Sequence, residues 1–397
     1  MKGIKKIALG LVTCLAFSAV PAYASTDVIT LLPFPVEAAV SENTRVLTLE
    51  EAFQLARRNN SSIDALNDAM IFSEQQRREW AVSYDNAWRF GLGFLDHSAE
   101  QLARLIRSID QASANAPAQT RITETVSDFL VLNSVITIRS LQIDLIVLRE
   151  TMALNTVTLN HTELRNRLGM ASNAEVVSAR QELERNRAML RALNIGLESQ
   201  RAGLNYLLGL PSSADVVVEH DFSLEVGSIS ERVGNIHAYA DRQVARDPSL
   251  QILRRQLETA QHNYDNTQNW LQNSLTAQPG QNLNWETNAT DRATMLNTLN
   301  NASRDLRDAT DSMRENIRNA YNQLRQLEEQ RQTLVIDLQG AYDTYNTVKV
   351  NLAAGMATQH QADAARLLVM LAESNLIKTA LNYELLLFTF DSPFLLR

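Results

Sequence analysis

Residues 167–180, "RLGMASNAEVVSAR", join two long helical patterns through a short turn that decides the fold. The chain uses the same kind of turn again in residues 352–366, "LAAGMATQHQADAAR". Gly169 and Gly355 each follow the end of a helical pattern, where glycine adopts a left-handed conformation without a Cβ penalty. Each stretch therefore predicts the tight tip of a hairpin of two antiparallel helices.

The residues after each glycine are typical of a helix start. Ser172 and Glu175 match a capping box, in which side chain and backbone hydrogen-bond reciprocally, and Gln361 stands in the matching place after Thr358. Turn and cap chemistry alone accounts for both tips, and docking of a partner protein is the alternative. The tip residues are Gly169, Met170, Ala171, Ser172, Gly355, Met356, Ala357 and Thr358.

Apolar residues between Ile122 and Leu168 recur at alternating steps of four and three, the 3.5-residue period of a coiled coil. A second stripe runs beside the first between Ile138 and Leu159. One stripe buries a helix against one neighbour, so two stripes predict neighbours on both sides, as in a sheet or tube of helices. Further helices are expected over residues 172–208, 290–354 and 358–388. The predicted fold class is mainly all-α, with internally duplicated long antiparallel hairpins.

The two halves of the chain repeat one another. Five of the twelve residues in Gly169–Arg180 are identical in Gly355–Arg366, 186 residues later. A fixed offset of this length indicates an internal repeat. We place repeat 1 at residues 47–210 and repeat 2 at 236–391, joined by a linker over 211–235 whose "DVVVEHDFSLEV" resembles a short strand.

The N-terminus reads as an export signal over residues 1–24. Lysines precede an apolar run over residues 7–20, and "AYA" ending at Ala24 is a small-x-small cleavage site. We expect cleavage after Ala24, followed by an extended linker over 25–46. A lipoprotein signal at Cys14, the only cysteine, is the alternative. The prediction is a location in the cell envelope: outer membrane and periplasm, or the cell surface of a host with one membrane.

Composition narrows the class of protein. Removing the three signal lysines leaves 34 basic against 45 acidic residues, which argues against a nucleic-acid partner. Only 13 Gly and 8 Pro suit long helices. No segment after the signal reads as a transmembrane helix. The six histidines are scattered without metal-ligand spacing, and no catalytic or nucleotide motif occurs. We therefore expect no enzyme activity, no cofactor and no metal site.

The sequence resembles the TolC family of outer-membrane efflux channels. "LTLEEAFQLARRNNSSI" is similar to the family's opening helix, and residues 169–211 are similar to its hairpin tip, return helix and closing Gly-x-Pro. The resemblance covers most of residues 47–391. It implies that three copies form a helical tube for efflux or secretion, driven by an inner-membrane pump. It also implies that the tips meet a periplasmic adaptor protein.

The sequence departs from the family in two places. Members carry two membrane strands per repeat, and the only candidate in the first half is "WRFGLGFL", with alternating Trp88, Phe90, Leu92 and Phe94. These aromatics could anchor in a membrane or pack a helix end, so barrel strands are expected to be reduced or absent. Members also carry Asp six and nine residues after the second tip glycine, where this chain has Gln361 and Ala364.

Two functions follow from these observations. The favoured one is a subunit of a trimeric envelope duct that works with an adaptor and a pump. The alternative is a barrel-less envelope scaffold or spacer that conducts nothing. The two stripes per helix favour the duct, and the missing strands favour the scaffold.

Overall fold

The computed structural model describes residues 44–89, 97–220, 227–275 and 285–396, which belong to one unit, Pro33–Arg397. The expected signal cleavage after Ala24 lies outside these residues. The described part of the chain is mainly helical, as predicted. Its first half contains β1 (Arg45–Thr48), α1 (Leu49–Arg58), α2 (Ser61–Arg89), α3 (His97–Arg167), α4 (Asn173–Leu207) and β2 (Val216–Glu219).

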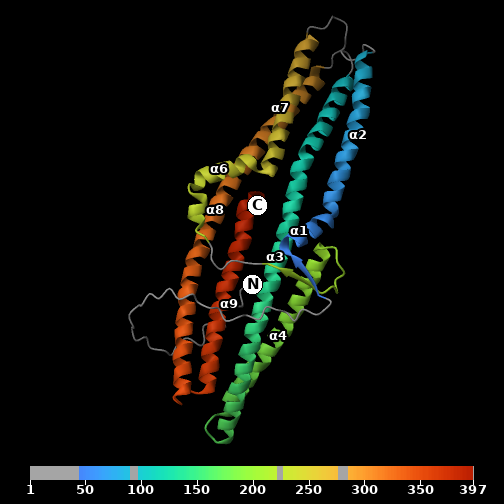
Figure 1. The fold of residues 1–397 in the computed structure, drawn as a ribbon. Coiled ribbons are helices and arrows are strands. Elements are labelled where there is room, and N and C mark those ends of the chain that lie inside the picture. The colour runs from blue at the N-terminus through green and yellow to red at the C-terminus, as the bar shows by residue number, and fades with distance from the viewer. Residues whose placement is uncertain (1–43, 90–96, 221–226, 276–284, 397) are drawn as a thin grey trace. The chain divides into compact units, whose positions relative to one another are not determined.

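The second half repeats the helical order of the first. It contains α5 (Ile229–Val233), α6 (Ile236–Arg246), α7 (Pro248–Leu275), α8 (Trp285–Ala353), α9 (Gln359–Asp391) and the 3₁₀ helix η3 (Pro393–Leu396). Helices α3 and α4 form one hairpin, α8 and α9 form the other, and α9 lies beside α3 (Figure 1). The long helices, 71 residues in α3 and 69 in α8, correspond across the two halves.

Helix α3 begins at His97, well before the coiled-coil pattern that starts at Ile122. The helix continues through Pro117. A proline inside a helix removes one backbone hydrogen bond and frees nearby carbonyl groups. Arg255 of α7 donates to the carbonyl of Ala114, three residues before the proline, so a contact between α3 and α7 falls beside it.

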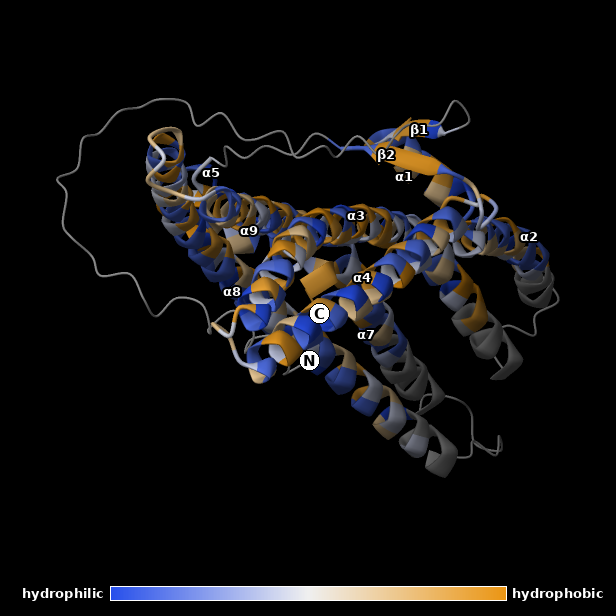
Figure 2. Ribbon diagram, turned by 90° about the horizontal axis from the view of Figure 1, so that it is seen from below, coloured by the Kyte–Doolittle hydropathy of each residue, from blue (hydrophilic) through white to orange (hydrophobic). Residues whose placement is uncertain are grey.

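The apolar content of α3 corrects one expectation. Its Leu105–Arg167 stretch is long and apolar enough to span a membrane by length and composition, with a mean hydropathy of 1.6 over its best window. Figure 2 shows hydrophobic residues recurring along this helix. Val131, Ile136 and Ile143 are buried against other helices, so packing within the chain accounts for part of this apolar content, and 39% of the window is buried.

Three apolar clusters hold the helices together. One lies in the first half and includes Ala52, Val131 and Leu204, from α1, α3 and α4. A larger one in the second half joins α5, α6, α7, α8 and α9. The third joins the two hairpins, since it packs residues of α3 against residues of α9. Its buried members are Leu132, Ile136, Ile143, Ile377 and Leu381.

Two short elements were not expected from the sequence. β1 lies at the end of the predicted 25–46 linker and pairs in parallel with β2, with Arg45 opposite Val216. The predicted strand in the inter-repeat linker is confirmed over Val216–Glu219. Within the same linker, α5 is helical, because its buried Ile229 and Val233 join the second-half cluster.

A partly buried polar contact holds α5 against the second hairpin. The backbone N–H of Ile229 donates to a Glu328 carboxylate oxygen at 2.6 Å, and the Tyr383 hydroxyl donates to the same oxygen at 3.1 Å. Burial, followed by the nearby Glu328 carboxylate, raises the pKa of Tyr383 above its usual value. The phenol therefore remains protonated and continues to donate.

The end of α4 requires a glycine for two reasons. Gly209 has a φ of +70°, and an added Cβ would lie 2.6 Å from the Asn59 side-chain oxygen. Asn59, which follows α1, donates to the carbonyl of Tyr206 at 3.0 Å and so caps α4. The two helices therefore meet too closely here for any side chain at residue 209.

We predict that Gly209→Ala lowers the free energy of unfolding by about 1–3 kcal/mol, because it adds left-handed strain and displaces Asn59. Gly203→Ala is the matched control, because Gly203 lies inside α4 with nothing within 4 Å of an added Cβ. That control should raise stability by roughly 0.5–1 kcal/mol. Denaturant unfolding measures both, and equal effects would contradict the role given to Asn59.

Candidate functional site at the hairpin tips

The first tip is built by backbone and side-chain hydrogen bonds together. The N–H of Gly169 donates to the carbonyl of Asn166 at 2.9 Å, and that of Met170 to the carbonyl of Arg165 at 2.8 Å. These two bonds form a Schellman motif, with Gly169 at a φ of +71°. Asn166 also donates its side-chain amide to the carbonyl of Ala171 at 2.8 Å, which stabilises the turn.

The second tip has the same geometry. The N–H of Gly355 donates to the carbonyl of Leu352 at 3.0 Å, and that of Met356 to the carbonyl of Asn351 at 2.7 Å. Gly355 has a φ of +70°. The turn chemistry predicted from the two glycines is therefore confirmed at both tips.

Both return helices begin with the predicted capping boxes. The N–H of Glu175 donates to the Ser172 hydroxyl at 3.2 Å, and the N–H of Ser172 donates back to the Glu175 carboxylate at 3.2 Å. At the second tip, the N–H of Gln361 donates to the Thr358 hydroxyl at 3.3 Å, and the N–H of Thr358 donates back to the Gln361 side-chain oxygen at 2.8 Å. The capping box therefore explains the presence of Gln361. In the family that the sequence resembles, this is one of the two positions that carry Asp.

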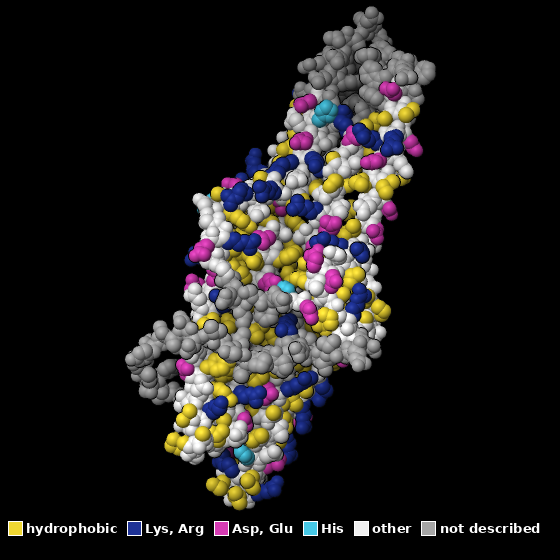
Figure 3. Space-filling view, viewed as in Figure 1, with side chains coloured by type: hydrophobic (Ala, Val, Ile, Leu, Met, Phe, Trp, Pro, Cys, Tyr) yellow, Lys and Arg dark blue, Asp and Glu magenta, His cyan; other side chains and the backbone are white. Residues whose placement is uncertain are grey.

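Large apolar side chains lie exposed at these tips. Met170 is 65% exposed and Met356 74% exposed, and Leu168 beside the first tip is 65% exposed. Figure 3 shows hydrophobic side chains interspersed with Lys and Arg side chains at the end of the molecule that carries the α3–α4 turn. The backbone of each tip is rigidly bonded while its methionines face outward, so the tips present two similar apolar projections.

The first hairpin is braced near its tip by an ion pair. Arg180 of α4 lies 2.9 Å from Glu163 of α3. Arg180 therefore joins the two helices of its own hairpin, whereas Arg366, at the matching place in the second hairpin, is exposed.

The candidate membrane-anchor segment is only partly described. Helix α2 continues to Arg89, so the backbone at Trp88 is helical, while Phe90, Leu92 and Phe94 lie outside the described residues. Trp80, on the same helix, is 36% exposed. In the second half, α7 reaches Leu275 and α8 begins at Trp285. Of the candidate strand over residues 88–95, the structure describes only Trp88 and Arg89, and their backbone is helical.

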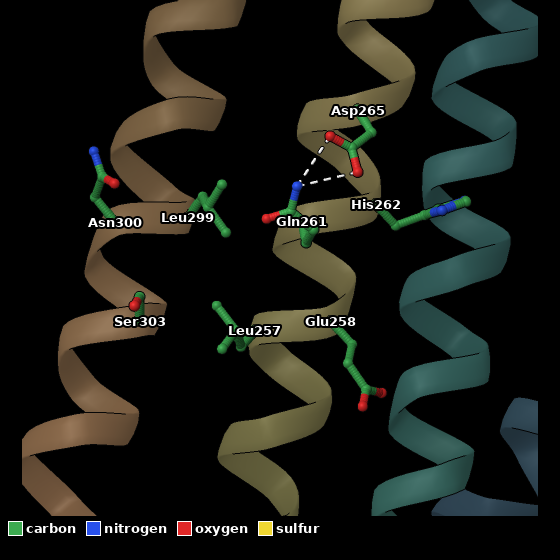
Figure 4. A pocket seen from close by; sticks show the side chains of 8 residues that line it. All are labelled: Leu257, Glu258, Gln261, His262, Asp265, Leu299, Asn300 and Ser303. Atoms are coloured by element: carbon green, nitrogen blue, oxygen red, sulfur yellow. Dashed lines mark hydrogen bonds between the residues drawn. The ribbon is translucent and has the colours of Figure 1, made fainter.

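A surface groove of about 690 Å³ lies between α7 and α8, and the sequence did not indicate it. Leu257 and Leu299 face one another across it, and Asp265 accepts two bonds from Gln261 at 3.0 and 3.1 Å (Figure 4). The Asp265 carboxylate is thus engaged on its own helix. Among the described residues, no group of three or more His, Cys, Asp or Glu side chains could hold a metal ion.

One contact near the tips has no signal in the sequence. His161 of α3 and His360 of α9 lie with ring centroids 5.8 Å apart. The six histidines are scattered along the sequence, without metal-ligand spacing. The proximity of these two arises from the antiparallel pairing of α3 with α9, two helices almost 200 residues apart in the chain.

The capping carboxylate makes the first tip sensitive to pH. Hydrogen bonds from the backbone and side chain of Ser172 lower the pKa of Glu175 below its ordinary value of 4.5. A lowered folded-state pKa contributes stability above the ordinary value, and this contribution is lost as the pH falls through the folded-state value. Gln361 does not titrate, so the second tip lacks this dependence.

We predict that moving from neutral pH to about pH 3 reduces the hydrogen-exchange protection of the amides of residues 172–176. The amides of residues 358–362 should keep their protection, after correction for intrinsic exchange. Glu175→Gln should remove the difference, because it gives the first tip the chemistry of the second. Equal loss at both tips in the unmodified chain would contradict this assignment.

Comparison with known proteins places the fold. No family model matches the chain, and no curated protein matches it. A membrane protein from Pseudomonas aeruginosa has a similar structure, with a TM-score of 0.65 and 10% identity over 87% of this chain and 92% of that one.

Two channel structures match in the same way. The CmeC outer membrane channel of Campylobacter jejuni has a TM-score of 0.63 at 10% identity, over 87% of this chain and 85% of its own. The outer membrane protein VceC of Vibrio cholerae has a TM-score of 0.58 at 11% identity, and the match covers 87% of this chain and 96% of VceC. The chain therefore has the fold of the TolC-family outer membrane channels that its sequence resembles.

Proposed function

We propose that the chain is one subunit of a homotrimeric helical duct in the cell envelope, which carries efflux or secretion cargo with an adaptor and an inner-membrane pump. The observation that carries this proposal is the pair of long hairpins arranged as in outer membrane channels. Each proposed repeat, residues 47–210 and 236–391, would supply one hairpin to the wall of the tube.

The helix surfaces support assembly beyond one chain. Helix α3 already packs against α4 on one side and α9 on the other, yet large apolar side chains remain exposed along the hairpins. A tube interior is wet, so apolar residues on the flanks suit contacts between subunits. The exposed apolar residues on the hairpins include Val157, Leu164, Val177, Met189, Ile195, Ile336, Val350, Leu368 and Leu371.

The tips support a docking role. Methionine is flexible and adapts to varied apolar partner surfaces, and each tip projects one exposed Met from a bonded turn. Two similar tips on one chain would offer repeated sites to an adaptor. This is the role that the resemblance assigns to Gly169–Ser172 and Gly355–Thr358.

The alternative remains a non-conducting envelope scaffold. It is supported by α2, whose helical backbone includes Trp88 and Arg89, the first two residues of the candidate strand. A spanning strand needs about 9–11 residues, whereas the described strands β1 and β2 have four each.

Conductance separates the two functions. The purified chain, added to a planar lipid bilayer, should produce discrete conductance steps if it forms a duct. A scaffold should produce none. Deleting residues 88–95 should abolish both conductance and envelope association of a membrane-inserting duct, and leave the association of a scaffold unchanged.

We predict that the double variant Met170→Glu and Met356→Glu loses in-cell crosslinking to its adaptor, because charge replaces apolar contact at both tips. The free energy of unfolding should change by less than about 0.5 kcal/mol, since both side chains are exposed. Ile71→Glu, an exposed apolar residue on α2, is the matched control and should keep crosslinking. Retained crosslinking in the double variant would exclude the tips as the docking site.

A further inference from the structure

The two hairpins meet near their tips through a pair of histidines. His161 of α3 and His360 of α9 have ring centroids 5.8 Å apart and planes inclined by 65°. His161 lies six residues before the end of α3, and His360 is the second residue of α9. The pair therefore connects hairpin 1 to hairpin 2, rather than two helices of one hairpin.

The histidine pair belongs to a regular helix interface. Phe129 packs on Phe388 with centroids 6.3 Å apart, and Asp144 forms an ion pair with Lys378. Helices α3 and α9 are antiparallel, so residues later in α3 contact residues earlier in α9. The contact of His161 with His360 continues this register. Their proximity is thus set by the packing of two long helices.

One imidazole nitrogen at this place has no partner. Nδ1 of His360 is buried from solvent and makes no hydrogen bond to the described residues. A buried polar atom without a partner is costly, and imidazole nitrogen is the commonest protein ligand of transition metals. The chemistry of this atom therefore suits a bound cation.

The spacing of the rings fits one shared metal ion. A metal bonded at about 2.1 Å to a ring nitrogen lies roughly 3.2 Å from the centre of that ring. Two rings on one metal then have centres about 5–6 Å apart at near-tetrahedral angles. The observed 5.8 Å falls within this interval. We propose that His161 and His360 bind one divalent transition-metal ion, of the Zn²⁺ or Ni²⁺ class, that links the two hairpins.

The neighbouring acids are already engaged, so the proposed site has two protein ligands. Glu163 pairs with Arg180 at 2.9 Å, and Asp363 accepts a bond from Gln359 at 2.8 Å. Water completes the coordination, and binding is weaker than in a structural site with four protein ligands. Such a site responds to the ambient metal concentration instead of holding a permanent ion.

The proposed metal site goes beyond the proposed function, because it concerns the distance between the two hairpins of one chain. It would apply equally to a duct subunit and to a scaffold protein. Bound metal ties α3 to α9 about eight residues from the first tip. The relative position of the two tips then depends on metal.

Titration of the full chain with Zn²⁺, and separately with Ni²⁺, tests the proposal by calorimetry. One site per chain is expected, and His161→Ala and His360→Ala should each weaken it by about tenfold or more. His237→Ala and His262→Ala, exposed histidines on α6 and α7, should leave it unchanged.

A second readout follows the hairpins themselves. Spin labels on Met170→Cys and Met356→Cys, in a Cys14→Ser background, should show a narrower tip-to-tip distance distribution with Zn²⁺. The narrowing should vanish in His161→Phe, which preserves ring packing. Absence of Zn²⁺ uptake by the parent chain, or uptake unchanged in both alanine variants with native circular dichroism, would overturn the proposal.

Discussion

The contact between α3 and α9 is the interaction on which the rest of the structure depends. Leu132, Ile136 and Ile143 pack against Ile377 and Leu381, and each buried aliphatic side chain contributes roughly 1.5–3 kcal/mol of transfer free energy. Without this interface, each half would keep its own apolar cluster and its own hairpin. The α3–α9 contact places the two hairpins side by side, and the α3–α7 contact adds a second link between the halves.

The sequence was most informative where structure is decided locally. Gly169 and Gly355 identified both tips, because few residues other than glycine adopt positive φ without strain. Ser172 and Thr358 identified the helix starts, since a capping box involves residues only three apart. The two stripes on α3 correctly predicted neighbours on two faces.

Long-range pairings were beyond the sequence for physical reasons. β1 has four residues and pairs with β2 across 171 positions, so neither its length nor its pattern marks it as a strand. α5 is helical because Ile229 and Val233 enter a cluster formed by other helices. The meeting of His161 and His360 depends on the register of α3 with α9, which no local pattern encodes.

The central claim is that the hairpins assemble into a trimeric tube, and the native mass of the chain without its first 24 residues tests it most directly. Native mass spectrometry and light scattering, with and without detergent, would measure this mass. The account predicts three times the mass of one chain. A monomer at high concentration in both conditions would contradict it, and would leave the hairpins as parts of a scaffold.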